Sequence, residues 1–365
     1  MSDQEALKAP FVWFGGKRKV APVVWERLGD VDNYVEPFAG SLAVLLGRPM
    51  SDDLSERRTE TVNDADHYLS NFWRSIASDP EEVAHWADWP VNEDDLFARH
   101  LWLVNEGRQI LAEGIEADPF FYDPMIAGWW VWGVNSWIGG GWCAGNGPWK
   151  KDDDGIVRKG GSAGQGVNRQ LPHLGDAGQG VNRKLPHLGD AGRGVNRQRP
   201  HLGDAGRTGF WRMEHRQDGL TAYFMQLANR LRDVRVCTGD WSRIVTKGAL
   251  SFGGTVGVFL DPPYSGEVRT EGLYAEDGLD VAEQVRKWAI ANGDDKRLRI
   301  VLAGYSDEHD DEIPGNWERV RWTASAAYQT TNSASDASDG NQANRRNEVL
   351  WCSPGCLGTE QGRLW

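Results

Sequence analysis

The segment Val256-Gly-Val-Phe-Leu-Asp-Pro-Pro-Tyr264 decides the fold class of this chain. Its first five residues are apolar, and a short apolar run of this kind is typical of a buried strand. Neither Pro262 nor Pro263 can continue a hydrogen-bonded ladder, so the strand must end at Asp261. Open α/β sheets bind their ligands beyond the carboxyl ends of their strands. We therefore expect the tetrapeptide 261–264 to belong to a binding site.

This tetrapeptide carries the groups needed to methylate an amine on a nucleobase. The Asp261 carboxylate and a nearby backbone carbonyl can both accept hydrogen bonds from an exocyclic amino group, which leaves the nitrogen lone pair free to attack an electrophile. The Tyr264 ring can stack on the heterocycle once the base has left its stack. The alternative is an ordinary proline turn that closes a core strand, because four-residue matches occur by chance.

Composition describes a globular protein with an acidic surface. The chain has 365 residues, of which 40% are hydrophobic and 25% charged, enough for one or two domains. The net charge of −13 argues against a protein coated in basic residues, so any DNA-binding surface must be local. No run approaches a membrane span and no apolar signal segment is present. We expect a cytoplasmic protein without membrane contact.

The four cysteines are Cys143, Cys237, Cys352 and Cys356. The last two form a short C-x-x-x-C pattern, but no second Cys/His pair accompanies it, and structural zinc takes four ligands. We therefore expect free thiols and no metal.

Two segments near the N-terminus indicate a nucleotide-binding α/β sheet. In Asn33–Leu46, a short strand, a turn with Pro37 and Gly40, and a helix follow one another, as in the first unit of such sheets. No G-x-G-x-x-G fingerprint is present, which argues against a dinucleotide. A second strand ends in acids at Asp64 and Asp66. An acid about 20 residues past the glycine turn is where ribose hydroxyls are held, although either aspartate can instead cap the next helix.

The middle of the chain is expected to form an insert of helices and loops. Residues 128–149 are rich in Trp and Gly, which fits either core packing or a stacking surface for bases. Residues 166–207 are three near-identical copies of a 14-residue unit in which basic residues outnumber acids. This repeat is the obvious local basic element of an acidic protein. The alternative is a surface loop without a role.

Strands and helices resume after the insert. A helix is expected at 220–231, followed by a strand that ends in Asp240-Trp241, where an acid beside an aromatic ring can hold an adenine-like group. The alternation predicts one α/β sheet interrupted by the insert. The expected divisions are 1–72 and 220–365 for the sheet domain and 73–219 for the insert.

Five motifs in order carry a family resemblance: Trp-Phe-Gly-Gly-Lys, Glu-Pro-Phe-Ala-Gly, Asn-Asp-Ala-Asp, Gly-Asp-Trp and Asp-Pro-Pro-Tyr. With these, the chain resembles the Dam-type DNA adenine methylases, which transfer a methyl group from S-adenosylmethionine to adenine N6 in DNA. The resemblance covers residues 10–72 and 220–355. It implies a Rossmann-like class I methyltransferase sheet with helices on both faces and a target-recognition insert, in a phage-type member.

The resemblance also implies a role for individual residues. Asp261 and the Pro262 carbonyl would accept from the target amine, and Tyr264 would stack on the flipped adenine. The family turn often has a further glycine where this chain has Ser41-Leu42. The residues implied to bind S-adenosylmethionine are Trp13 and Lys17 at its border, Glu36, Phe38 and Gly40 in the main turn, Asp64 at the ribose, and Asp240 and Trp241 at the adenine ring.

The expected substrate is double-stranded DNA, bound by a monomer. The sequence leaves phage protection, restriction–modification and regulation open as the biological role. Three alternatives stay open at this point. A cytosine N4 methyltransferase needs the same hydrogen-bond acceptors, so the tetrapeptide does not separate the two bases. A non-catalytic DNA-binding protein can share the fold, and RNA or protein is a further possible substrate.

Overall fold

In the computed structural model, the described residues are 7–11, 13, 16–49, 58–137, 142–143, 149–152, 155–158, 216–251, 254–263, 281–322 and 348–358. Tyr264 and the repeats at 166–207 lie outside these ranges, as does most of the Gly-rich stretch that follows residue 137.

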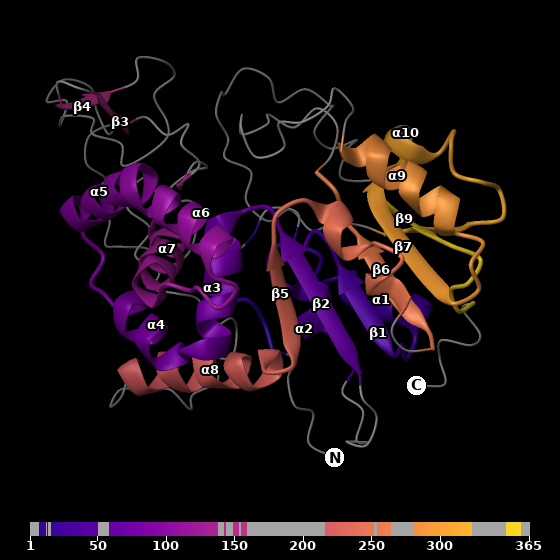
Figure 1. Cartoon of the computed structure of the whole chain (residues 1–365), viewed down its shortest axis with the longest axis horizontal. Coiled ribbons are helices and arrows are strands. Elements are labelled where there is room, and N and C mark those ends of the chain that lie inside the picture. The colour runs from indigo at the N-terminus through magenta and orange to yellow at the C-terminus, as the bar shows by residue number, and fades with distance from the viewer. Residues whose placement is uncertain are drawn as a thin grey trace, which may run out of the picture.

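A seven-stranded sheet forms the centre of the molecule (Figure 1). Its strand order is β5-β2-β1-β6-β7-β9-β8. The first five strands are parallel, and β9 runs antiparallel to both of its neighbours. This is the nucleotide-binding order with one antiparallel strand added, and the order reverses between β1 and β6, where such sheets bind their ligands. The strands are β1 (Asn33–Glu36), β2 (Thr59–Asp64), β5 (Val234–Thr238), β6 (Val256–Leu260), β7 (Leu298–Tyr305), β8 (Glu318–Arg321) and β9 (Glu348–Cys352).

Helices cover both faces of the sheet, as predicted. Phe259, Val301 and Leu350 pack in one apolar cluster with α1 (Ala21–Leu28), α2 (Ala43–Leu46), α3 (His67–Ser78) and α8 (Arg216–Leu231). The alternate residues, such as Val258 and Ile300, pack in a second cluster with α9 (Val281–Asn292). Strand β6 is buried at every position, as its continuous apolar run requires in a sheet covered on both sides. The α/β fold class is confirmed.

The insert forms a lobe of helices beside the β5 edge of the sheet (Figure 1). It contains α4 (Pro80–Ala87), α5 (Glu93–Trp102), α6 (Arg108–Ala117) and α7 (Pro124–Ser136), and a small hairpin of β3 (Trp149–Asp152) and β4 (Gly155–Arg158). Asp79, Asn92 and Asp123 cap α4, α5 and α7 by accepting a backbone N–H of the first turn, which is why these helices begin where they do.

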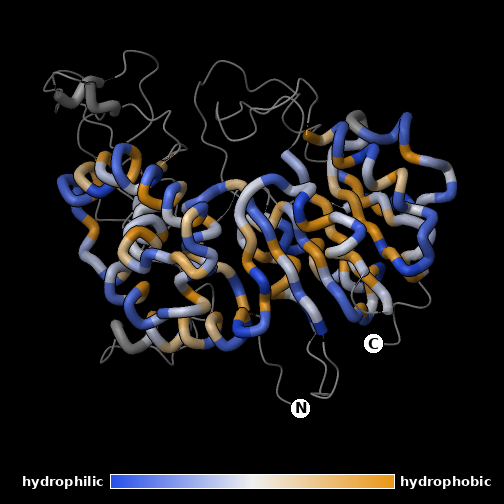
Figure 2. Tube along the Cα trace, viewed as in Figure 1, coloured by the Kyte–Doolittle hydropathy of each residue, from blue (hydrophilic) through white to orange (hydrophobic). Residues whose placement is uncertain are grey.

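Two of the three tryptophans of α7 are core residues. Trp130 is 2% exposed and Trp132 is fully buried, and apolar residues follow the inward faces of the lobe as well as the strands of the sheet (Figure 2). Of the two interpretations of this Trp-rich stretch, core packing is therefore confirmed for its helical part.

One strand of the sheet was not predicted, and the predicted domain boundary is not tested by the fold. Strand β8 was not expected, because Glu318–Arg321 is mostly exposed and charged and shows no apolar alternation. The expected boundary at residues 72 and 73 falls inside α3, so the division into domains stays a prediction. Among the described residues, no helix is long and apolar enough to cross a membrane.

Candidate active site at the carboxyl edge of the sheet

Asn63 joins the turns that follow three neighbouring strands. Its side-chain amide donates to the Pro37 carbonyl at 3.1 Å and to the Gly239 carbonyl at 2.9 Å. The backbone carbonyl of Asn63 accepts from Ala39 N at 2.9 Å. The ends of β1, β2 and β5 are thereby held in one layer. Sequence reasoning did not select Asn63 as a site residue, and its position just before Asp64 was the only signal.

Asp64 lies at the centre of this layer. Its carboxylate accepts backbone N–H groups from Gly40 at 3.0 Å and from Asp66 at 2.9 Å. Asp66 caps α3 by accepting from Tyr68 N at 2.8 Å, so the cap role falls to Asp66. Burial raises the pKa of Asp64 to about 6, against the lowering effect of these backbone hydrogen bonds. Asp64 therefore lies at the sheet edge with each carboxylate oxygen bonded to a backbone N–H, and its role at a ribose stays a prediction.

Gly40 allows Trp13 to approach the turn closely. Gly40 has a φ of +47°, and a Cβ there would lie 3.0 Å from Cδ1 of Trp13. The Trp13 ring also contacts the rings of Phe11 and Trp130, each with a centroid distance of 5.9 Å. The indole N–H of Trp73 donates to the Gly40 carbonyl at 3.0 Å. The glycine turn is thus tied to the helical lobe through tryptophans.

Leu42 stands in this turn where the family pattern often has a further glycine. Leu42 precedes α2 with a φ of 55° and a ψ of 25°, the left-handed conformation that glycine adopts more easily. Its side chain is fully buried in the core cluster of α1 and α2. Burial of this side chain offsets the unfavourable backbone conformation.

Lys17 and Asp261 form an ion pair beside this turn. Nζ of Lys17 lies 3.0 Å from Oδ1 of Asp261, and their side chains are 5% and 19% exposed. Pro262 is buried and Pro263 is exposed. Asp261 therefore keeps a partly accessible carboxylate at the point where the strand order reverses.

The environment of Glu36 favours its protonated form. Burial, reinforced by the charge of Asp261, raises its pKa to about 8, against the lowering effect of the hydrogen bond from Tyr34. The hydroxyl of Tyr34 donates to Oε2 of Glu36 at 2.9 Å. A protonated carboxyl can donate as well as accept hydrogen bonds.

The β5 end of the site combines an acid with aromatic rings. Asp240 is exposed and accepts from Ser242 N at 2.9 Å. Trp241 is 5% exposed, and its ring stacks on Phe38 with a centroid distance of 6.1 Å. Phe38 is half-buried and is thus the more accessible ring of the pair, with Trp241 behind it.

The structure brings together the predicted residues that it describes. They lie at the carboxyl ends of β1, β2, β5 and β6 or just before α1: Trp13, Lys17, Glu36, Phe38, Gly40, Asp64, Asp240, Trp241, Asp261, Pro262 and Pro263. Tyr264 lies outside the described residues. In the described part of the chain, no group of three or more His, Cys, Asp or Glu residues could hold a metal ion, and all four cysteines are free thiols.

A mixed sheet of this order, with helices on both faces and acids at its carboxyl edge, is the fold of the Rossmann-like methyltransferases. Residues 13–100 match the family described as D12 class N6 adenine-specific DNA methyltransferase. The match spans about a quarter of the chain and includes the motifs from Trp13 to Asp66. Residues 13–100 thus match this family, and the chain is an enzyme that methylates adenine in DNA. The predicted family and reaction are confirmed, and the cytosine, non-catalytic, RNA and protein alternatives are set aside. No curated protein matches the chain.

Proposed function

We propose that this enzyme binds S-adenosylmethionine over β1, β2 and β5 and presents an adenine of double-stranded DNA to Asp261. The observation that carries the proposal is the Lys17–Asp261 ion pair of 3.0 Å at the reversal of strand order. It places an anionic acceptor beside a layer of acids and aromatic rings, in a chain with an adenine methyltransferase domain.

The residues of the β1–β2–β5 edge fit the proposed cofactor. Asp240 is an exposed carboxylate that precedes Trp241 in the chain, and the Trp241 ring stacks on the half-buried Phe38 ring. An acid and aromatic rings of this kind suit a purine ring with an amino group. Asp64 uses its two oxygens for backbone N–H groups and retains lone pairs for ribose hydroxyls. Trp13 and Lys17 would border the rest of the molecule. Bound there, S-adenosylmethionine would supply an electrophilic methyl group.

Asp261 would orient the target amine. Its ion pair with Lys17 favours the carboxylate form, which can only accept hydrogen bonds. The Asp261 carboxylate and the Pro262 carbonyl would each accept one N–H of adenine N6, which directs the nitrogen lone pair at the methyl group. Tyr264 would stack on the extruded base. Positioning and hydrogen bonding then account for the rate, without a covalent enzyme intermediate.

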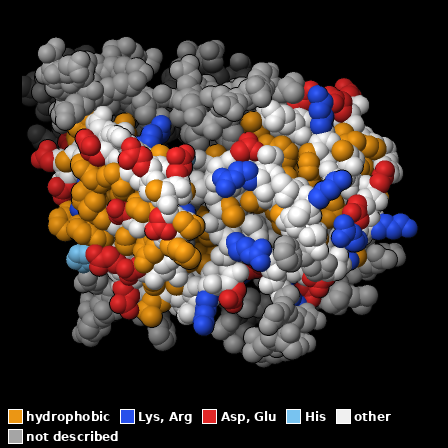
Figure 3. Space-filling model, viewed as in Figure 1, with side chains coloured by type: hydrophobic (Ala, Val, Ile, Leu, Met, Phe, Trp, Pro, Cys, Tyr) orange, Lys and Arg blue, Asp and Glu red, His pale blue; other side chains and the backbone are white. Residues whose placement is uncertain are grey.

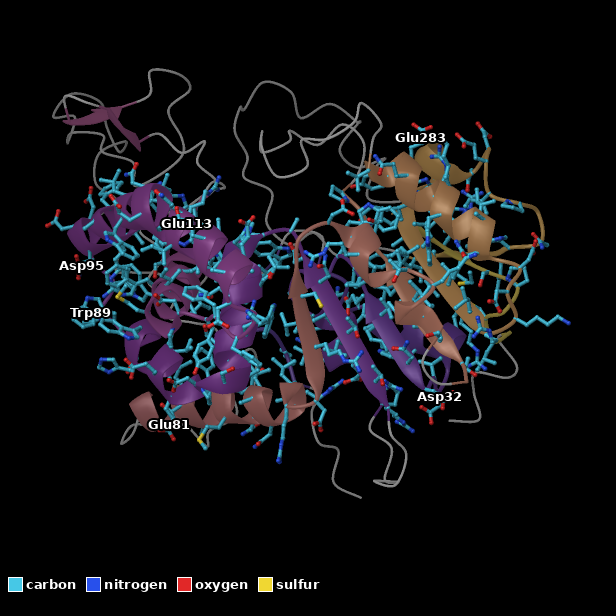
Figure 4. The ribbon with its side chains drawn as sticks, in the orientation of Figure 1. Asp32, Glu81, Trp89, Asp95, Glu113 and Glu283 are labelled. Atoms are coloured by element: carbon cyan, nitrogen blue, oxygen red, sulfur yellow. The ribbon has the colours of Figure 1, made fainter. Side chains whose placement is uncertain are left out.

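The described helices of the insert are unsuited to contact with phosphates. Residues 79–136 contain twelve acids but two arginines and no lysine, and Glu81, Asp95 and Glu113 point outward from the lobe (Figure 4). Acidic side chains border the apolar surface on the visible face of the lobe (Figure 3). We therefore assign the phosphate contacts to the basic repeats at 166–207. With this assignment, the sheet domain binds the cofactor and the insert recognises the DNA target. We expect the enzyme to act as a monomer.

Nucleoside mass spectrometry tests the proposal. DNA from methylation-deficient cells that express the wild type should contain N6-methyladenine, and DNA from cells with Asp261→Ala should lack it. Purified Asp261→Ala should still bind S-adenosylmethionine in calorimetry, whereas Asp240→Ala should bind it more weakly. A wild type that leaves DNA unmethylated would refute the reaction, and a wild type that does not bind S-adenosylmethionine would refute the cofactor. Equal loss of methylation and cofactor binding in Asp261→Ala would contradict the role given to Asp261.

A further inference from the structure

A further acid, Glu348, lies at the same edge of the sheet. It is the first residue of β9 and pairs with Tyr305, the last residue of β7. Its side chain is 8% exposed, and its Oε2 atom has no hydrogen-bond partner among the described residues. An unpaired buried carboxylate oxygen is unfavourable, so a structural role alone gives no reason for an acid at this position.

Side-chain alternation places Glu348 on the face that Lys17 covers. Leu350 packs in the cluster of α1, whereas Val349 packs in that of α9. Successive residues of a strand point to opposite faces, so Glu348 shares the α1 face with Leu350. By the same alternation Glu36 shares that face with Tyr34, which packs against α1. Lys17 lies just before α1.

A row of three carboxyl groups therefore lies on this face: Glu36 on β1, Asp261 just after β6, and Glu348 on β9. The Lys17 ammonium lies beside the row, 3.0 Å from Asp261. The burial of Glu348 raises its pKa, the charge of Lys17 lowers it and that of Asp261 raises it again, so these groups act on one another. The other titratable groups facing the row are Tyr34, which bonds Glu36, and Tyr305, the strand partner of Glu348. Glu60 also acts on Glu36.

We propose that Glu348 is a positioning residue for methyl transfer. Its carboxylate attracts the Lys17 ammonium from the β9 side while Asp261 binds it from the β6 side. Lys17 is thereby fixed between two anions, and Asp261 is held in the orientation that accepts the target amine. The inference rests on the proposed function, because it assigns to Glu348 a role in the reaction at Asp261.

This role is tested by comparing Glu348→Gln with the wild type in single-turnover methyl transfer. The rates are measured from pH 5.5 to 9 with saturating DNA and S-adenosylmethionine. We expect the rate to fall about 10- to 100-fold, as for residues that orient a reacting group through another, with little change in cofactor affinity. The acid limb of the pH profile should move to lower pH, because removal of an anionic neighbour lowers the pKa of the remaining carboxyls. Glu348→Asp should restore part of the rate. Glu318→Gln, on the neighbouring β8, is the matched control. It weakens the ion pair of Glu318 with the buried Arg27, which affects stability, but should leave the rate and the acid limb as in the wild type.

The Lys17→Met background separates positioning from folding. If Glu348 acts through Lys17, adding Glu348→Gln to Lys17→Met should cost little further rate, whereas independent effects would multiply. Multiplicative effects would overturn the inference, as would an active wild type whose Glu348→Gln variant keeps both its rate and its acid limb. A rate loss that follows the melting temperature with an unmoved pH profile would reduce Glu348 to a structural role. A wild type that does not methylate DNA would instead refute the proposed function, and the inference with it.

Discussion

Gly40→Ala tests whether the glycine turn is as constrained as its contacts indicate. The φ of +47° places residue 40 in the left-handed region, which costs a residue with a Cβ about 1–2 kcal/mol. The new Cβ would also lie 3.0 Å from Cδ1 and 3.1 Å from Nε1 of Trp13. That ring cannot retreat freely, because it packs against Phe11 and Trp130. Overpacking of this kind adds about 1 kcal/mol or more, so we expect a loss of about 2–3 kcal/mol in the free energy of unfolding.

Urea denaturation would measure this loss, and calorimetry with S-adenosylmethionine would show its effect on binding. Gly40 donates its N–H to Asp64 at 3.0 Å, so a shifted turn should also weaken cofactor binding. Gly315→Ala is the matched control, because a Cβ at Gly315 meets no atom of the described residues within 4 Å. This substitution should change stability by less than about 0.5 kcal/mol. If Gly40→Ala were as stable as Gly315→Ala and bound the cofactor normally, the reasoning about the turn would be refuted.

Three further substitutions test the same layer by urea denaturation. Leu42→Gly relieves a left-handed leucine, worth about 1–2 kcal/mol, but empties a buried site whose truncation costs about 2–5 kcal/mol. We expect a net loss of about 1–3 kcal/mol, and a gain in stability would show that strain dominates. Asn63→Ala leaves the Pro37 and Gly239 carbonyls without their donor and should cost about 2–3 kcal/mol, with weaker cofactor binding; unchanged affinity would show that Asn63 does not organise the site. The pKa of Glu36 is raised from 4.5 to about 8 in the folded state, so the native protein binds this proton more tightly than the unfolded chain does. The free energy of unfolding of the wild type, relative to that of Glu36→Gln, should therefore fall by about 3–5 kcal/mol as the pH rises from 4.5 to 8. A flat difference across this range would contradict the shift.

The sequence was informative where local chemistry determines structure. The apolar run 256–260 became a fully buried strand, and the prolines that follow it ended that strand. The choice between Asp64 and Asp66 as helix cap needed the structure, because both stand near the start of α3. Asp66 accepts from the nearby Tyr68 N–H, whereas Asp64 accepts from Gly40, a donor that is distant in sequence. Trp13 offered the same difficulty, since its partner Trp130 is far away in sequence. The place of Glu348 could not be predicted at all, because it depends on β9 lying next to β7, a non-local pairing.

The distribution of charge leads to a consequence for DNA binding. The exposed surface of the described insert helices is acidic, so phosphates must be neutralised elsewhere. The second and third repeats, residues 180–207, contain six arginine and lysine residues and two aspartates. Each phosphate contact contributes about −0.9 to the slope of log affinity against log salt concentration. If most of these bases contact phosphates, deletion of 180–207 should reduce the slope by several units while cofactor affinity is retained. An unchanged slope would place the phosphate contacts outside the repeats and leave them without a role in DNA binding.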